Sequence, residues 1–273
     1  MPPQTDGSIA AFIAAMPEEI AALEAAIAAR GGRAALDRSY ESIDRLEDHL
    51  LDVLPALAGQ EREETLARAA RYVGQTLVER AGGQWALRPR IRGRSEPCVL
   101  RLPDLGDYAL FPRAVVNTFA QANAAGVLRE ETENYDLPHR RSQLAALLAA
   151  APQELAAFAE DLREVSGEEV VALDQSLSSL EPVGRALARI YAARPPRERR
   201  RQVRDRAVLY VGQVIQRALG RGDWSVSGDP DRGDFGQFTI AGWAPRTLVG
   251  YLPPADPGAW LREEIEQEIE ARR

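Results

Sequence analysis

The sequence contains no lysine, so all 34 of its basic side chains are arginine. We attribute this bias to a GC-rich genome rather than to a need for guanidinium groups. Cysteine is almost absent as well, because Cys98 is the single one in the sequence. One cysteine excludes an internal disulfide and a zinc site made of clustered cysteines, which fits a reducing compartment.

Long apolar runs are also missing. No stretch of about 18 apolar residues occurs, so the sequence predicts no bilayer-spanning helix. Residues 1–15 lack the basic start and the long apolar centre of a secretory signal. We therefore expect a cytoplasmic protein that does not contact a membrane.

Histidine is scarce, and this argues against several kinds of catalysis. His49 and His139 are the only two, and we interpret both as incidental. No Gly-x-Ser-x-Gly motif accompanies them, so a nucleophilic triad is not predicted. The net charge of -7 works against general nucleic-acid binding, which depends on neutralising phosphates.

What the sequence does contain is an internal repeat. The letters Tyr-Val-Gly-Gln occur at 72–75 and again at 210–213, and a glycine-bearing turn and a tryptophan follow each copy. Apolar residues upstream recur at constant spacing within each predicted helix. The pairs are Ile20 and Leu155, Leu23 and Phe158, Ile27 and Leu162, Ile43 and Leu180, Leu46 and Val183, Leu50 and Leu187, and Val53 and Ile190. We predict a duplicated protein with a first unit at 9–128, a linker at 129–143 and a second unit at 144–273.

Each unit is expected to be α+β, with three helices, a small antiparallel three-stranded sheet and a closing helix. Proline in a first turn predicts helix starts at Pro17 and Pro152. Oxygen-bearing side chains predict the next starts, and these are Asp37, Ser39, Asp174 and Ser176. The predicted strands are 85–87, 98–102 and 108–111 in the first unit, and 224–226, 238–240 and 248–252 in the second. The closing helices are predicted at 112–125 and from 257 onward.

Glycine and aspartate clusters have ordinary explanations here. Gly74 and Gly212 lie inside predicted helices, where glycine costs about 1 kcal/mol relative to alanine. We expect a neighbouring backbone to pack against them. The glycines that follow these helices are typical of helix ends rather than of phosphate-binding loops, so no nucleotide cofactor is predicted. Three aspartates at 229–234 lack the spacing of a calcium loop, and we interpret them as turn residues rather than as a metal site.

Six residues of the repeated motif are candidates for ligand binding at the junction of helix and sheet. They are Tyr72, Gln75, Trp85, Tyr210, Gln213 and Trp224. Tyrosine and tryptophan also fill interfaces between helices and sheets while their polar ends find partners, and we favour this packing role.

A basic run near the start of the third helix of the second unit is a candidate binding patch. Its arginines are Arg197, Arg199, Arg200, Arg201 and Arg204. They could bind an acidic partner or a phosphate backbone. The simpler interpretation is a solvated helix start in an otherwise acidic protein. The equivalent residues 60–64 of the first unit are mostly acidic, which suggests that at most one unit uses this edge.

The two units resemble a group of small uncharacterised bacterial domains. The shared residues are Leu36-Asp37-x-Ser39-x-x-Ser42-Ile43, then Tyr72-Val73-Gly74-Gln75, then Gly82-Gly83-x-Trp85. That group has a Leu-Asp-x-Ser-x-x-Ser-Leu start, a Tyr-x-Gly-Glu helix and a Gly-Gly-x-Trp strand entry. Gln75 and Gln213 depart from its glutamate. The resemblance implies no established activity and suggests accessory or immunity-like proteins.

We therefore expect a non-enzymatic protein-binding or adaptor protein, with an immunity-like role as one form of it. One alternative is a small-ligand binder or enzyme that uses the junction of tyrosine, glutamine and tryptophan. A second alternative is nucleic-acid binding through the segment 194–206. The sequence leaves open the oligomeric state and whether the units pack together.

Overall fold

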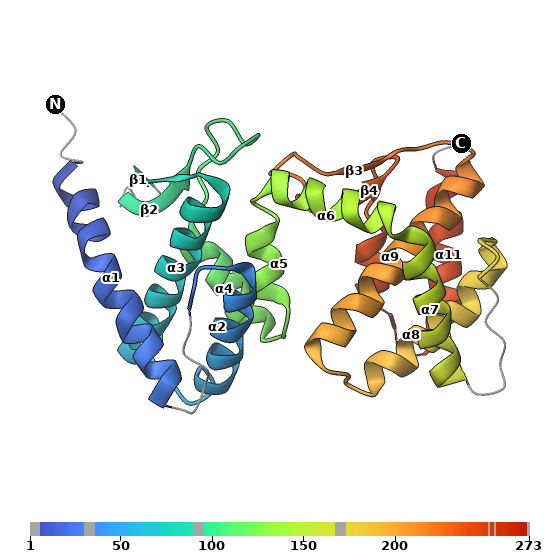
Figure 1. Ribbon diagram of the computed structural model, residues 1–273, viewed down its shortest axis with the longest axis horizontal. Helices are drawn as coiled ribbons and strands as arrows, with labels where there is room; N and C mark the ends of the chain where they lie inside the picture. The colour runs from blue at the N-terminus through green and yellow to red at the C-terminus, as the bar shows by residue number, and fades with distance from the viewer. Residues whose placement is uncertain are drawn as a thin grey trace. The chain divides into compact units, whose positions relative to one another are not determined.

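The computed structural model describes residues 6–29, 36–89, 95–166, 173–250, 252–253 and 255–271. Contacts between Cα atoms divide the chain into two units, Met1–His139 and Arg140–Arg273. Both combine helices with small antiparallel sheets, which confirms the predicted α+β class (Figure 1). The division falls inside the segment 129–143 that we predicted to be a linker.

The first unit is built on α3, which packs against α1 and α4, while α2 packs against α5. Its elements in order are α1 (Asp6–Ala29), α2 (Tyr40–Val53), α3 (Gly59–Ala81), β1 (Gln84–Pro89), β2 (Ser95–Leu100), α4 (Pro112–Ala122) and α5 (Val127–Glu133). Apolar residues at helical spacing form the core, among them Leu46, Leu50, Val73 and Leu77, which are fully buried. This is the pattern expected of an amphipathic helix that turns one face inward.

The second unit is built in the same way on α9. Its elements are α6 (Leu137–Ala149), α7 (Ala151–Ser166), a 3-10 turn η2 (Leu177–Ser179), α8 (Leu180–Ala192), α9 (Arg197–Leu219), β3 (Trp224–Val226), β4 (Phe238–Ile240), α10 (Pro245–Gly250) and α11 (Pro257–Glu270). The helix α9 packs against α7 and α10, and α8 packs against α11. Its core includes Phe158, Leu187, Val211 and Leu261.

The described sheets have two strands each rather than the three we predicted. β1 pairs antiparallel with β2, placing Trp85 opposite Val99, and β3 pairs with β4, placing Trp224 opposite Ile240. The expected third strand of the first unit is reduced to one antiparallel bridge, between Val99 and Leu110. A bridge from Ile240 to Trp243 takes the same place in the second unit.

The strand predicted at 248–252 is wrong, because Leu248, Val249 and Gly250 end the helix α10. Proline is favourable at the first position of a helix, and Pro245 supplies it there. A short apolar run does not distinguish a buried helix turn from a buried strand. Packing against α9 decides the matter. The remainder of that prediction includes Tyr251, which lies outside the described residues.

The predicted linker at 129–143 is helical instead, because it contains most of α5 and the first half of α6. Its polarity suggested an exposed connection, yet Arg129 and Glu133 are buried and bonded to one another. Pro138 suggested a break, but it lies in the first turn of α6, where no backbone donor is needed.

The helix α1 begins at Asp6, well before the start that we predicted at Pro17. Its first turns are held by tertiary contacts, since Met16 is buried and the Phe12 ring packs edge-on against Trp85 at 5.1 Å. These contacts compensate for a proline inside the helix, which removes one backbone hydrogen bond. Around Pro152 the chain instead divides into α6 and α7.

Candidate functional site

The glycine repeated in α3 and α9 leaves space for an aromatic ring in each unit. A Cβ added to Gly74 would fall inside the indole ring of Trp85, and one added to Gly212 would fall inside that of Trp224. We expected a neighbouring backbone at these positions, so this detail of the prediction is wrong. Each glycine is required because the ring of a tryptophan from the first strand of its unit lies where a side chain would be.

The repeated tyrosine joins the helix to the loop that precedes α2. The Tyr72 hydroxyl accepts a hydrogen bond from the backbone N–H of Arg38 at 2.8 Å and shares another with the Ser42 hydroxyl. In the second unit, Tyr210 makes the same two contacts, with the N–H of Gln175 at 3.2 Å and with Ser179. Both tyrosines are almost completely buried. Burial raises the pKa of both phenols, so they stay neutral.

Of the residues predicted as helix caps, the two serines are confirmed, because Ser39 caps α2 and Ser176 caps the 3-10 turn η2. The aspartates are not caps; they bind the capping serines instead. The Ser39 hydroxyl oxygen accepts from the N–H of Ser42, and Ser176 accepts from the N–H of Ser179. Asp37 in turn accepts from the hydroxyl and the N–H of Ser39, and these bonds lower the pKa of its carboxyl. Asp174 accepts from the N–H of Ser176.

The glutamines of the motif link different parts of the two units. The indole N–H of Trp85 donates to the Gln75 side-chain oxygen at 3.0 Å. Gln213 instead accepts from the Gln175 side chain at 2.9 Å. In each unit the tryptophan ring thus lies against the helix that carries the tyrosine and the glutamine, and the polar atoms of the tyrosine and the glutamine bind other atoms of that unit. This arrangement favours the packing role over a ligand site.

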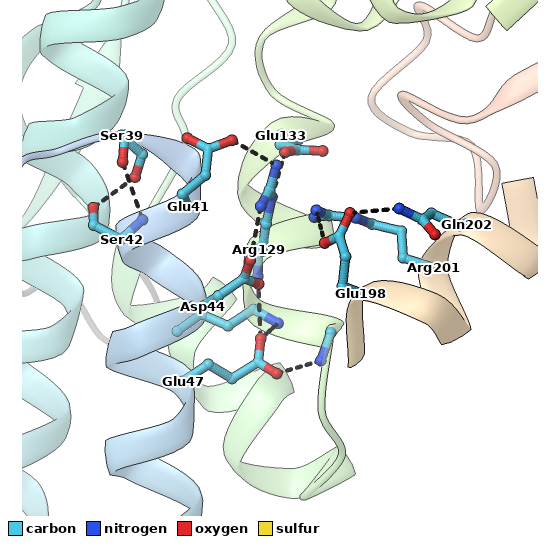
Figure 2. Close-up of polar contacts among 12 residues, drawn as sticks. Ser39, Glu41, Ser42, Asp44, Glu47, Arg129, Glu133, Glu198, Arg201 and Gln202 are labelled. Carbon is cyan, nitrogen blue, oxygen red and sulfur yellow. Dashed lines mark hydrogen bonds and ion pairs between the residues drawn. The ribbon is translucent and has the colours of Figure 1, made fainter. Parts of the chain in front are cut away.

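A second polar cluster, which the sequence did not predict, surrounds Arg129 of α5 (Figure 2). Its guanidinium donates to Glu133 and Asp44 at 2.7 Å each and to Glu41 at 3.1 Å. Burial disfavours the charged guanidinium, but Glu133 and Asp44 outweigh it and raise the pKa of Arg129. The side chain is only 9% exposed, so this network is a buried, multiply bonded ion cluster.

A fourth carboxylate, that of Glu47 on the neighbouring helix α2, caps the start of α5. It accepts from the backbone N–H groups of Gly126, Leu128 and Arg129 (Figure 2). A helix start carries free amides and a partial positive charge, so a buried carboxylate is stabilised there. The cluster therefore fixes α5 against α2.

The second unit contains a smaller version of this cluster. Arg262 of α11 donates to Glu266 at 2.7 Å and to Glu181 of α8 at 2.8 Å. A glycine, Gly184, stands in α8 where α2 has Glu47, and it lies against the backbone of Pro257 at the start of α11. That start is capped locally by Asp256.

The sequence contained a signal for this pair that we missed. Residues 128–133 read Leu-Arg-Glu-Glu-Thr-Glu, and residues 261–266 read Leu-Arg-Glu-Glu-Ile-Glu. We had assigned the first stretch largely to a linker and matched the wrong helices. By packing, α5 corresponds to α11 and α4 corresponds to α10.

The predicted basic patch is largely matched by acidic side chains of its own unit. Arg199 lies between Asp161 and Glu164, and Arg201 pairs with Glu198 at 2.8 Å. Arg197 is the first residue of α9. Arg200 lies over the Tyr191 ring, and Arg204 lies beside Asp205. The face is therefore less basic than its sequence suggests, which weakens the case for a phosphate-binding surface.

The aspartate loop, His139 and Cys98 are the remaining candidates from the sequence, and local structure accounts for them. The aspartate loop is a turn, in which Asp229 accepts from the N–H of Asp231. Among the described residues, no group of three or more histidine, cysteine, aspartate or glutamate side chains could hold a metal ion. His139 stacks on Tyr40 at 4.7 Å, and burial raises the pKa of the Cys98 thiol to about 11.

Of the helices in the described parts of the chain, none combines the length and the apolar character needed to cross a membrane. Comparison with family models, with curated proteins and with solved structures finds no match to this chain.

Proposed function

We propose that the two units are copies of one ancestral module, of the bacterial domain type that the sequence resembles. The support is that distant residues make the same contacts in each unit. The tyrosine binds the loop before the second helix, the glycine accepts the tryptophan ring, and the arginine of the Leu-Arg-Glu-Glu segment pairs with the second helix. Sequence similarity by chance does not explain paired contacts between separate helices.

We further propose that the chain is a non-enzymatic protein-binding or adaptor protein of the bacterial cytoplasm, with an immunity-like role as one form. One observation carries this proposal. The motif residues hold the interior of each unit together, while the helix edges at the starts of α3 and α9 have opposite charge. A preserved scaffold with diverged edges favours recognition of a partner through one edge.

The alternatives receive less support from the geometry. The tyrosines of the junction are buried and bonded, which leaves their hydroxyls little freedom to bind a ligand. Arg199 and Arg201 at the start of α9 are paired with carboxylates, so weak retention on heparin is expected even at low salt.

The test is capture of the full chain from its own cells at native abundance, followed by quantitative mass spectrometry. We expect one protein at near-stoichiometric yield. Its recovery should fall when charges at the start of α3 are neutralised and should persist when equally exposed charges elsewhere are neutralised. Recovery of no stoichiometric partner, or of one that is insensitive to all surface variants, contradicts the proposal.

A further inference from the structure

A cleft of about 170 Å³ opens in the first unit between α1, α2 and the start of α3. Its floor is apolar, because it includes the buried side chains of Leu23 and Val53. Glu61 and Glu64 line it from α3 and are exposed. Pockets for small-molecule ligands are usually about 300–1,000 Å³, so this cleft suits a single long side chain better.

We propose that this cleft binds an arginine or lysine side chain of a partner protein. The inference rests on the protein-binding function proposed above and assigns it a surface and a chemistry. A long basic side chain combines an apolar stem with a cationic end. The stem would lie on Leu23 and Val53, and the cation would meet the carboxylates of Glu61 and Glu64. Charge-assisted hydrogen bonds of this kind are the stronger ones in proteins.

Two glutamates, Glu61 and Glu64, and one arginine, Arg68, line the cleft, so the carboxylates outnumber the arginine. Arg68 donates from its Nε to Glu19 of α1 at 3.0 Å, and Glu19 also pairs with Arg71 at 2.8 Å. Glu64 accepts one hydrogen bond from the neutral side chain of Gln60. The carboxylates at the cleft therefore keep their charge available to an incoming cation.

The second unit has different side chains at the positions equivalent to those that line the cleft. Phe158 stands at the position of Leu23, Asp161 at that of Ala26, and Arg199 at that of Glu61. Asp161 pairs with Arg199 at 3.5 Å and with Arg206 at 2.7 Å. A larger ring and an arginine of the chain itself thus stand at positions that line the cleft in the first unit. The first unit has a smaller side chain, Leu23, and the carboxylates of Glu61 and Glu64 at these positions, which suits an arginine supplied from outside.

The experiment is an NMR titration of the isotope-labelled full chain with Nα-acetyl-arginine methylamide. The matched neutral probe is Nα-acetyl-citrulline methylamide, which has nearly the same shape without the charge. We expect the arginine probe to shift the amide signals around Leu23 and Thr65 and to bind at least about tenfold more tightly. That factor corresponds to one charge-assisted contact of about 1.4 kcal/mol. Equal binding of the two probes overturns the proposal.

Substitutions in the cleft test whether the arginine probe binds there. Replacing both cleft carboxylates, Glu61→Gln with Glu64→Gln, should weaken the arginine probe about tenfold. Glu18→Gln, on the exposed side of α1, is the matched control and should leave the affinity unchanged. Leu23→Phe, which introduces the ring of the second unit, should abolish binding. If Leu23→Phe does not fold, the two surface substitutions still decide the question, since unchanged affinity in them overturns the proposal.

The outcome of this titration is independent of the outcome of the cellular capture experiment. Charge-selective binding in the cleft supports this inference even when no partner is captured. A captured partner does not rescue it when the arginine and citrulline probes bind alike.

Discussion

Gly74 shows at the residue scale how one position can be unfavourable locally and necessary globally. Glycine weakens α3 by about 1 kcal/mol relative to alanine. Its missing side chain leaves the space that the indole of Trp85 fills, and Gly212 does the same for Trp224. Burial of a tryptophan contributes more than the helix loses. The repeated glycine in the motif is therefore a packing residue.

Gly74→Ala should destabilise the first unit. Overpacking costs about 1–3 kcal/mol, which exceeds the gain of about 1 kcal/mol in helix propensity. Gly212→Ala should act in the same way on the second unit. The measurement is the free energy of unfolding in urea. Gly250→Ala is the control, because a Cβ there meets nothing within 4 Å. Stability that is unchanged in the first two variants would show that the indole rings can move aside.

Arg129 and Arg262 form a second matched pair at this scale. Arg129 is 9% exposed, and of its three carboxylate partners Glu133 is 7% and Asp44 19% exposed, so Arg129→Ala leaves these two charges without their cation away from solvent. Such a loss typically costs about 3–5 kcal/mol. Arg262 is 39% exposed, and solvent screens its two partners, so Arg262→Ala should have a much smaller effect.

Thermal unfolding of both arginine variants checks this contrast. The expected result is a large fall in the melting temperature of the first unit and a small one in that of the second. Arg129→Lys should recover only part of the loss, because an ammonium group cannot reproduce the planar set of donors. Equal sensitivity of the two units would contradict the buried character of the Arg129 cluster.

At the scale of elements, the two units differ in where a proline lies within its helix. Pro17 lies inside α1, whereas Pro152 lies in the first turn of α7. Proline inside a helix costs about 3 kcal/mol, and in the first turn it costs little. The contacts of Phe12 and Met16 keep α1 continuous despite this cost.

Pro17→Ala should therefore stabilise the first unit, with an upper limit of about 3 kcal/mol. Pro152→Ala should change the second unit little, and it serves as the control. Chemical denaturation followed by circular dichroism measures both effects. A destabilised Pro17→Ala variant would mean that a bend at this point is needed for α1 to reach α3.

These elements also show what the sequence could and could not predict. Periodic apolar residues identified the helices around Leu46 and Val73, and serine caps identified the start of α2. The function of Gly74 was not predictable in detail, because periodicity does not reveal which side chain crosses a helix. The helix α5 was missed because a buried arginine cluster has the composition of an exposed loop. The contacts of Arg129 distinguish the two, and the letters Leu-Arg-Glu-Glu, repeated at 128–131 and 261–264, were the sequence signal for this helix.

At the scale of the whole molecule, each unit has the parts of a self-sufficient domain. Each encloses its own apolar core, and the chain divides at His139 and Arg140 by its internal contacts. Domains of 100–150 residues with separate cores can fold alone. The proposed fusion of two copies has the same consequence, since it requires a module that folds alone.

We therefore expect residues 1–139 and residues 137–273, expressed separately, to fold; the overlap keeps α6 intact in the second fragment. Each should unfold in one cooperative transition and give dispersed amide signals by NMR. The control is residues 1–105, which lack α4 and α5 and so leave the inner faces of α2 and α3 uncovered. This fragment should not fold. If the control folds as well as residues 1–139, the unit boundaries are wrong; if neither half folds, the units depend on one another and the proposed fusion of independent modules fails.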